Sequence, residues 1–310
     1  MHPSGTPGLN LKSDFRGRTR QPEGMKKPTT KDKSGLRRIS VAAATIVAGL
    51  TAALLFVLPT LRGSAYVSTP LTSAPANRDP AATGSERKHK VLYLTHSAGF
   101  KHAVLPLSEQ IFREIGAQSG FEVTPTADCS LICKDGLKEY DAVAFYTTGE
   151  LPIADAQKAD LLDFVRSGKG FVGIHSATDT FYKWPEYGEM IGAYFDKHPW
   201  HQQVKIKVED PRHPATSHLG STFTITDEIY QFRNWSRKSV HVLLSLDVSS
   251  VDLGKPDVHR TDRDFANSWC RDYGKGRVFY TALGHRPEVW QDERFQRHLI
   301  GGLRWTIRAE

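Results

Sequence analysis

The sequence predicts an exported α/β domain built on a mostly parallel sheet, behind an N-terminal segment directed to the membrane. Three observations carry this prediction: a charge-free apolar run near the N-terminus, short apolar runs alternating with helical periodicity, and later runs that alternate apolar and polar residues. Strands that alternate with helices are typical of parallel pairing, with helices on both faces of the sheet. We therefore expect an open α/β sheet with an antiparallel or irregular insertion.

The apolar run predicts a membrane crossing. Residues 39–58, ISVAAATIVAGLTAALLFVL, hold no charge, amide or histidine, and as a helix they would span about 30 Å, the thickness of a bilayer's hydrocarbon core. Ten of the 41 Lys and Arg residues lie in residues 1–38, against three of the 34 Asp and Glu residues, so this tail carries +7 and the rest of the chain is neutral. The positive-inside rule then keeps the tail in the cytoplasm and places the C-terminal part outside.

Composition divides the chain into four parts. We expect a disordered basic cytoplasmic tail at 1–38, a transmembrane anchor or uncleaved signal at 39–61, a Ser/Thr/Ala/Pro-rich linker at 62–88 and one domain at 89–310. The length of the apolar run favours a single-pass anchor in the cell membrane, whereas cleavage at a small-residue motif in the linker would release a secreted protein. The neutral domain argues against a nucleic-acid partner.

The first half of the domain alternates strand and helix signals. Short apolar runs predict strands, and apolar residues at helical spacing, such as Leu107, Ile111 and Ile115, predict the helices between them. In chain order the predicted elements are a strand at 90–95, a helix at 106–118, strands at 121–124 and 141–147, a helix at 155–167 and a strand at 170–174.

The second half holds more strand. The segment QVKIKVE at 203–209 alternates apolar and polar residues, as a half-exposed strand does, and 241–246 and 276–282 are further strand candidates. A last helix is predicted at 292–307, where apolar side chains recur every four residues.

Four polar loops follow predicted strands and are dense in glycine, histidine, acids and aromatics. They are Thr95–His102, Thr147–Glu150, His175–Trp200 and Leu283–Trp290. Ligands bind beyond the carboxyl ends of the strands in open α/β sheets, so we expect these loops to meet in one site.

These motifs resemble a known family. The string GFVGIHSATDTFYKWPEYGEMIGAYF at 170–195, with HPAT at 213–216, DEIYQF at 227–232 and WCRDYGKGRVFYTALGH at 269–285, is similar to the ThuA-like (trehalose-utilisation-like) family. The resemblance covers about residues 88–310. It implies a flavodoxin-like three-layer sandwich related to class I glutamine amidotransferases, and a small-molecule carbohydrate partner of the trehalose or 3-keto glycoside type.

His175 is the most informative single residue. Gly173–Ala177 has the shape of a nucleophile elbow, a sharp strand-to-helix turn that thrusts one side chain into a site. The related amidotransferases carry a cysteine at that point. This chain has histidine there and is therefore not expected to be a glutamine amidotransferase. An imidazole in this place can transfer protons or bind a metal.

Two more histidines follow strands and are expected to point towards His175. His102 and His285, with Glu228 or Asp179, would form a site for zinc or a similar divalent metal. Metal-free acid–base work by His175, His102, His285 and Asp179 is the other catalytic hypothesis, and structural roles for these residues stay open. An enzyme with this site would be a sugar isomerase, lyase or hydrolase.

Further polar and aromatic residues are candidates for holding the sugar, although aromatic residues are more often part of a core. They are Glu150, Trp184, Tyr187, His198, His201, Arg233 and Asn234.

One departure from the family's pattern favours an alternative function. Phe265 stands where the family tends to have histidine, and a chain lacking that group could be a non-catalytic sugar-binding or scaffold protein.

Overall fold

The computed structural model describes residues 88–309. The predicted tail, membrane anchor, cleavage motifs and almost all of the linker lie outside the described residues. Within residues 88–309, no helix combines the length and the apolar character that a membrane crossing requires.

The described part of the chain forms nine strands and six α-helices. The strands are β1 (His89–Leu94), β2 (Phe121–Thr126), β3 (Ala142–Phe145), β4 (Gly170–Ile174), β5 (Tyr194–Val208), β6 (Thr222–Arg233), β7 (His241–Leu246), β8 (Ala266–Tyr273) and β9 (Gly276–Thr281). The helices are α1 (Leu105–Gln118), α2 (Lys134–Leu137), α3 (Asp155–Arg166), α4 (Pro185–Ile191), α5 (Pro287–Gln291) and α6 (Glu293–Ile307).

All nine strands belong to one sheet, in the order β2-β1-β3-β4-β9-β8-β7-β5-β6. The first five strands of that order pair in parallel, and β8, β7, β5 and β6 continue the sheet in antiparallel fashion. The predicted α/β class, with a mostly parallel part and an antiparallel insertion, is confirmed. The insertion is not a separate layer, because its strands extend the parallel sheet edge to edge.

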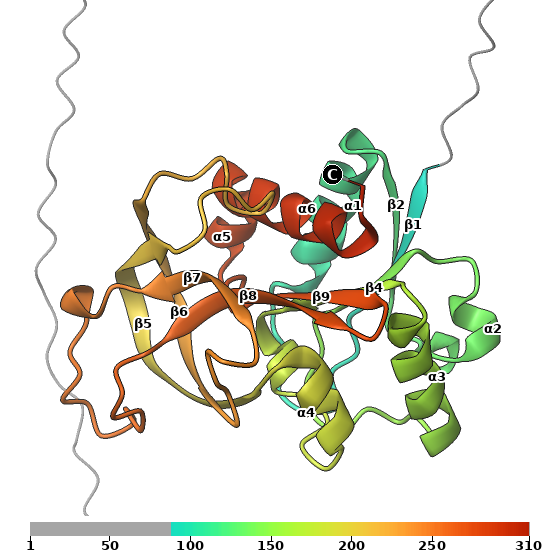
Figure 1. Cartoon of the computed structure of the whole chain (residues 1–310), viewed down its shortest axis with the longest axis horizontal. Helices are drawn as coiled ribbons and strands as arrows, with labels where there is room; N and C mark the ends of the chain where they lie inside the picture. The colour runs from blue at the N-terminus through green and yellow to red at the C-terminus, as the bar shows by residue number, and fades with distance from the viewer. Residues whose placement is uncertain (1–87, 310) are drawn as a thin grey trace, which may run out of the picture. The chain divides into compact units, whose positions relative to one another are not determined.

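Helices cover both faces of the parallel part, which makes the three layers (Figure 1). Side chains of α1, α5 and α6 pack into one hydrophobic core, and those of α2, α3 and α4 pack into the other. The central strands β3 and β4 are buried along their whole length, as strands covered on both sides must be.

Helix α6 shows how local sequence and packing agree. The Asp292 carboxylate caps its first turn by accepting a hydrogen bond from the Arg294 amide at 2.8 Å. The buried residues Phe295, Leu299 and Leu303 form one face of the helix. Gly301 lets the helix approach a neighbouring turn, because a Cβ atom there would lie 2.3 Å from the Pro214 carbonyl oxygen.

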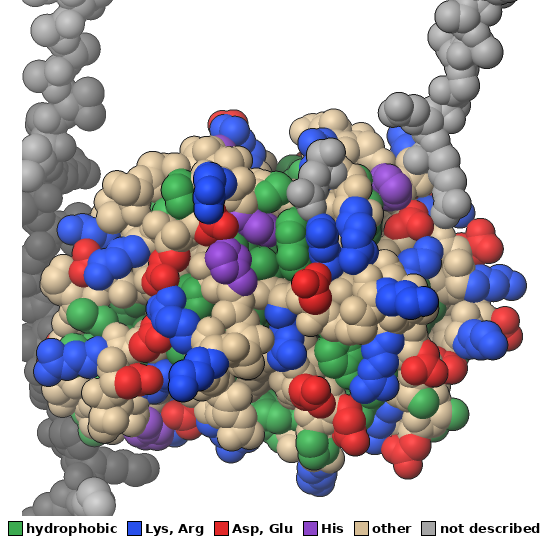
Figure 2. Space-filling model, in the orientation of Figure 1, with side chains coloured by type: hydrophobic (Ala, Val, Ile, Leu, Met, Phe, Trp, Pro, Cys, Tyr) green, Lys and Arg blue, Asp and Glu red, His purple; other side chains and the backbone are tan. Residues whose placement is uncertain are grey.

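The structure contains strands that the sequence pattern did not reveal. β6 and β8 were not predicted, and β5 begins at Tyr194 rather than at residue 203. The second half of β6, from Asp227 to Phe232, is buried on both faces. That half therefore lacks the alternation by which a half-exposed strand is recognised. Lys/Arg and Asp/Glu side chains are interspersed over the face drawn in Figure 2, as the neutral charge of this part of the chain leads one to expect.

Candidate functional site

His175 lies at the end of β4, in a strained turn. Its φ of 46° is in the left-handed region, which a residue with a Cβ atom seldom adopts. The chain turns there from a buried strand into a short 3₁₀ helix, and the side chain is completely buried. The Nδ1 atom lies 2.7 Å from the Ala282 carbonyl oxygen. Since a carbonyl oxygen only accepts, Nδ1 carries a proton, and Nε2 faces the site.

His285 follows β9 in a loop that a buried carboxylate holds. Asp227 on β6 accepts hydrogen bonds from the Gly284 amide at 2.7 Å and from the Arg286 amide at 3.2 Å. These bonds clamp the residues on both sides of His285. Burial raises the pKa of Asp227. Asp227 is a positioning residue that sequence reasoning missed, because its strand was not recognised.

Glu228, the next residue on β6, joins the two histidines. Its Oε2 atom lies 3.3 Å from Nε2 of His175 and 3.1 Å from Nδ1 of His285. Those two nitrogens are 3.2 Å apart. Burial raises the pKa of Glu228, but hydrogen bonds and charge interactions with the two histidines outweigh it and hold the pKa well below its usual range. The carboxylate is therefore ionised at neutral pH.

His102 completes a cluster of four. Its ring lies 5.0 Å from that of His175 and 5.2 Å from that of His285, and the rings of His175 and His285 are also 5.2 Å apart, measured between centroids. Burial lowers the pKa of His102 to about 3, so it is neutral. Its Nδ1 atom is buried and has no hydrogen-bond partner in the described part of the chain.

This geometry fits a divalent metal ion. One nitrogen or oxygen atom from each of His102, His175, Glu228 and His285 lies within 4.8 Å of the others. Ligands bound at 2.0–2.1 Å to one tetrahedral ion are about 3.4 Å apart, and their imidazole ring centres are about 5 Å apart. The atoms contributed by His175, Glu228 and His285 form a triangle of nearly that size. Neutral imidazoles with an ionised carboxylate are the forms that bind metal. Burial lowers the pKa of His285, but its hydrogen bond to Glu228 outweighs burial and raises that pKa, so a metal would displace a proton from this ring.

Other residues surround this four-residue cluster. Tyr230 was not among the predicted site residues. Its hydroxyl lies 2.9 Å from Nε2 of His175. His198 and His201 on β5 approach Glu228 from the solvent side, at 3.4 Å and 3.2 Å from its Oε1 atom. Phe100 is 65% exposed and packs edge-on against His102, with ring centroids 4.9 Å apart.

Some predicted site residues lie elsewhere. Trp184 and Tyr187 lie away from the four-residue cluster, in the core formed with α4. Their rings stack on each other, and Phe181 packs edge-on against both. Asp179 contributes no atom to the four-residue cluster, and its carboxylate accepts a hydrogen bond from the Tyr182 hydroxyl.

The remaining candidates lie near the surface. Glu150 accepts a hydrogen bond from the Lys183 amide at 3.2 Å. The Arg233 guanidinium stacks on Tyr182, 4.4 Å from its ring centroid. Asn234 lines a surface pocket of about 510 Å³. A sugar-binding role for Glu150, Arg233 and Asn234 stays a prediction.

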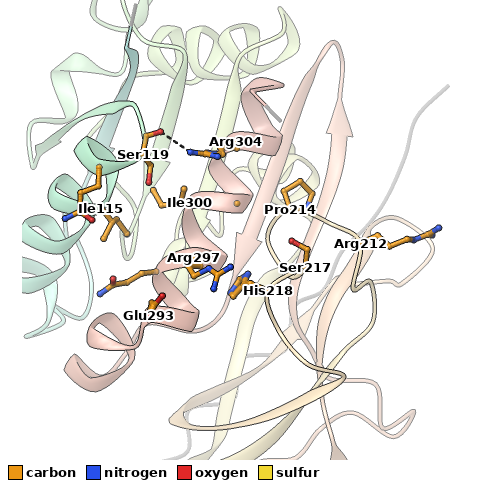
Figure 3. A pocket seen from close by; sticks show the side chains of 13 residues that line it. Ile115, Ser119, Arg212, Pro214, Ser217, His218, Glu293, Arg297, Ile300 and Arg304 are labelled. Atoms are coloured by element: carbon orange, nitrogen blue, oxygen red, sulfur yellow. Dashed lines mark hydrogen bonds between the residues drawn. The ribbon is translucent and has the colours of Figure 1, made fainter. Parts of the chain in front are cut away.

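A larger pocket, of about 610 Å³, lies away from these residues, between α1, α6 and the turn at residues 212–218. Its wall carries Arg297 and Arg304 from α6, with Arg212 from the turn (Figure 3). None of the four clustered residues lines it. The four-residue cluster is therefore the candidate site, since it combines convergent metal ligands with burial and the pocket does not.

The sequence and the fold are similar to those of known proteins. The family model for ThuA, described as trehalose utilisation, matches residues 90–306. A putative ThuA-like protein from Bacteroides uniformis has a similar structure, with 27% identity over 76% of this chain and 95% of that chain and a TM-score of 0.62. Another, from Parabacteroides merdae, shares 18% identity over 72% of this chain and 91% of that chain, with a TM-score of 0.57. No curated protein sequence matches the chain. With most of its length matched by the family model, the chain belongs to the ThuA family.

Proposed function

We propose that this protein is an extracytoplasmic, metal-assisted enzyme that acts on trehalose-like or 3-keto glycosides. Membership of the trehalose-utilisation family supports a carbohydrate-related role. The observation that carries the metal-assisted chemistry is the triangle formed by His175 Nε2, His285 Nδ1 and Glu228 Oε2, with sides of 3.1, 3.2 and 3.3 Å. His102 would supply the fourth ligand.

The proposed ligands suit a catalytic role. When bound, a divalent ion acts as a Lewis acid that polarises a sugar hydroxyl or carbonyl oxygen. Four protein ligands close a tetrahedral site, so substrate access requires an ion with at least five positions, or the release of one ligand. His102 lies outside the triangle of 3.1–3.3 Å formed by the other three ligands, so it is the ligand that would be released.

Protein groups around the cluster can hold the sugar. Burial raises the pKa of Tyr230 well above its usual value, so its hydroxyl stays protonated and can donate a hydrogen bond to a substrate oxygen. The exposed ring of Phe100 offers an apolar surface on which the C–H face of a pyranose can stack. His198 and His201 provide further polar contacts on the solvent side.

The alternative of a non-catalytic sugar-binding protein rested on Phe265. That ring is buried in the core and packs edge-on against Trp200 at 5.0 Å between centroids. Phe265 takes no group away from the four-residue cluster. Its presence in place of a histidine is therefore no argument against the proposed chemistry at that cluster.

Substitution of His175 tests the proposal. His175→Ala should lower turnover of a trehalose-type or 3-keto glycoside by about 10²-fold or more, the scale of acid–base or metal-ligand losses. Removing metal with EDTA should inactivate the wild type, and adding Zn²⁺ or Mn²⁺ back should restore it. His241→Ala, which changes an exposed histidine paired with Asp210, is the matched control and should be fully active.

Two results would contradict the proposal. Full activity of His175→Ala, with folding verified by circular dichroism, would remove this residue from the chemistry. An active wild type that is indifferent to EDTA, and that contains no metal by elemental analysis, would reject the metal and leave acid–base work by the same histidines.

A further inference from the structure

The two oxygens of Glu228 face two different groups of histidines. Oε2 meets an inner pair, the fully buried His175 and the partly exposed His285, while Oε1 meets His198 Nδ1 at 3.4 Å and His201 Nε2 at 3.2 Å. The outer two side chains are about half exposed, at 51% and 49%, against 24% for His285. The carboxylate thus lies between an inner set and a more exposed outer set of imidazoles.

An irregularity in β5 creates the outer set. In a regular strand, residues three apart point to opposite faces, so His198 and His201 could not meet one carboxylate oxygen. The pairing of β5 with β6 shifts register twice, between Phe195 and Lys197 and again between Lys197 and Trp200. Bulges of this kind re-aim side chains and are frequent beside active sites.

The outer distances are also those of metal ligands. A charged hydrogen bond between an imidazolium and a carboxylate is usually about 2.7–2.9 Å long, and both outer contacts exceed this. They match the separation of about 3.4 Å between two ligands of one tetrahedral ion. Exposure leaves room for water molecules to complete a coordination shell.

We propose that His198, His201 and Glu228 bind a second divalent cation, bridged by the Glu228 carboxylate to the cation held by the buried cluster. This inference rests on the proposed metal centre and adds a second ion to it. Carboxylate-bridged pairs in enzymes hold their ions about 3.5–4 Å apart and clamp two substrate oxygens at once. The rings of His198 and His201 are 5.9 Å apart between centroids, wider than the buried three, so the outer ion binds more weakly.

Metal stoichiometry tests the second site. The full-length protein is stripped with chelator, titrated with Zn²⁺, freed of unbound ion by gel filtration and measured by elemental analysis. We expect two ions per chain in the wild type, filled in two phases of different affinity. His198→Ala and His201→Ala should each hold one ion, while His241→Ala should hold two. Glu228→Gln, which removes the bridge, should weaken both phases.

A spectroscopic measurement covers the case in which a variant fails to fold. In the wild type loaded with Mn²⁺, two bridged ions should show the spin coupling of a pair at two equivalents, and one equivalent should give an isolated signal. One ion per chain at saturation, or two ions without spin coupling, would overturn the second site and leave the first intact. No bound ion would overturn both.

Discussion

At the scale of single residues, the candidate site depends on which atoms keep their protons. His175 donates from Nδ1 to a carbonyl oxygen, which directs Nε2 into the site. Burial keeps His102 neutral, and the neighbouring histidines keep Glu228 ionised. His102 and Glu228 are thereby held in the protonation states that a metal requires. Burial lowers the pKa of His285, but its hydrogen bond to Glu228 outweighs burial and raises that pKa, so His285 must release a proton when a metal binds. Tyr230 differs from these residues, because its buried hydroxyl retains its proton and serves as a polar contact or donor.

Tyr230→Phe isolates that hydroxyl without changing the packing of the ring. We expect kcat to fall by about 10- to 100-fold, since a hydrogen bond to a charged or polarised group contributes about 1.5–3 kcal/mol. The amount of bound metal should be unchanged. Steady-state kinetics separate kcat from KM, and elemental analysis counts the metal.

Tyr187→Phe is the control for that change. Like Tyr230→Phe, this substitution removes one buried tyrosine hydroxyl. The Tyr187 hydroxyl lies in the core and donates to the Ala177 carbonyl oxygen at 2.7 Å. The substitution should cost about 1 kcal/mol of stability with no loss of activity. Equal activity in the two variants would remove Tyr230 from the site's chemistry.

At the scale of secondary-structure elements, α6 illustrates how close packing uses glycine. The Cβ atom introduced by Gly301→Ala would lie 2.3 Å from the Pro214 carbonyl oxygen, a backbone atom that cannot rotate away. We expect this substitution to lower the free energy of unfolding by about 1–3 kcal/mol, the usual cost of overpacking. Urea unfolding measures the effect.

Arg297→Ala is the matched control for Gly301→Ala on the same helix. It lies on the exposed side of α6, and such surface substitutions usually change stability by less than about 0.5 kcal/mol. Equal stability of Gly301→Ala and the wild type would show that the turn at Pro214 can move.

The buried His298 on α6 should make the stability of the protein depend on pH. Its Nδ1 atom donates to the Ala215 carbonyl oxygen at 2.8 Å, and burial lowers its pKa to about 3. The unfolded chain has the ordinary histidine pKa of about 6.5, so the unfolded state binds a proton first as the pH falls. Stability from neutral His298 is therefore complete above about pH 6.5 and is lost between that pH and 3, by at most about 1.4 kcal/mol per pH unit.

The test compares the wild type with His298→Gln, whose amide can still donate to the carbonyl oxygen. Free energies of unfolding in urea should fall more steeply for the wild type between pH 7 and pH 4.5. His96→Gln, at a partly exposed position where the imidazole also meets a carbonyl oxygen, should follow the wild type. Parallel curves for all three proteins would contradict the prediction.

At the scale of the whole molecule, one continuous sheet brings the site together. His102, His175 and His285 follow parallel strands and meet at their carboxyl edge, while Glu228 and Tyr230 arrive on a strand of the antiparallel extension. The site therefore combines groups from both parts of the sheet. An unfolded or missing extension would leave the histidines without their carboxylate.

The topology of the full chain is tested with intact cells. If residues 39–58 anchor the protein with its domain outside, added protease should digest the chain from about residue 62 onward and spare the tail. Antibodies to each end, with a cytoplasmic marker as the control, report the result. A secreted form beginning within the linker would indicate cleavage, and a domain protected from protease in intact cells would contradict an extracytoplasmic location.

Local pattern alone determined much of this protein. The parallel strands, the helices α1, α3 and α6 and the meeting of His102, His175 and His285 could all be predicted. Hydrophobic periodicity is a property of a few neighbouring residues, and parallel strands always bring their carboxyl ends to one edge. The sharp turn at His175 was predictable for the same reason, since five consecutive residues define it.

Only the tertiary structure decided the rest. The burial of Trp184 and Tyr187 depends on helix α4 packing against the sheet, which nothing in their own segment reveals. The positions of Glu228 and Tyr230, and of His198 and His201 around the same carboxylate, depend on the register and bulges of β5 against β6. Register is set by contacts between residues far apart in sequence, and a shift of one residue turns every side chain to the other face.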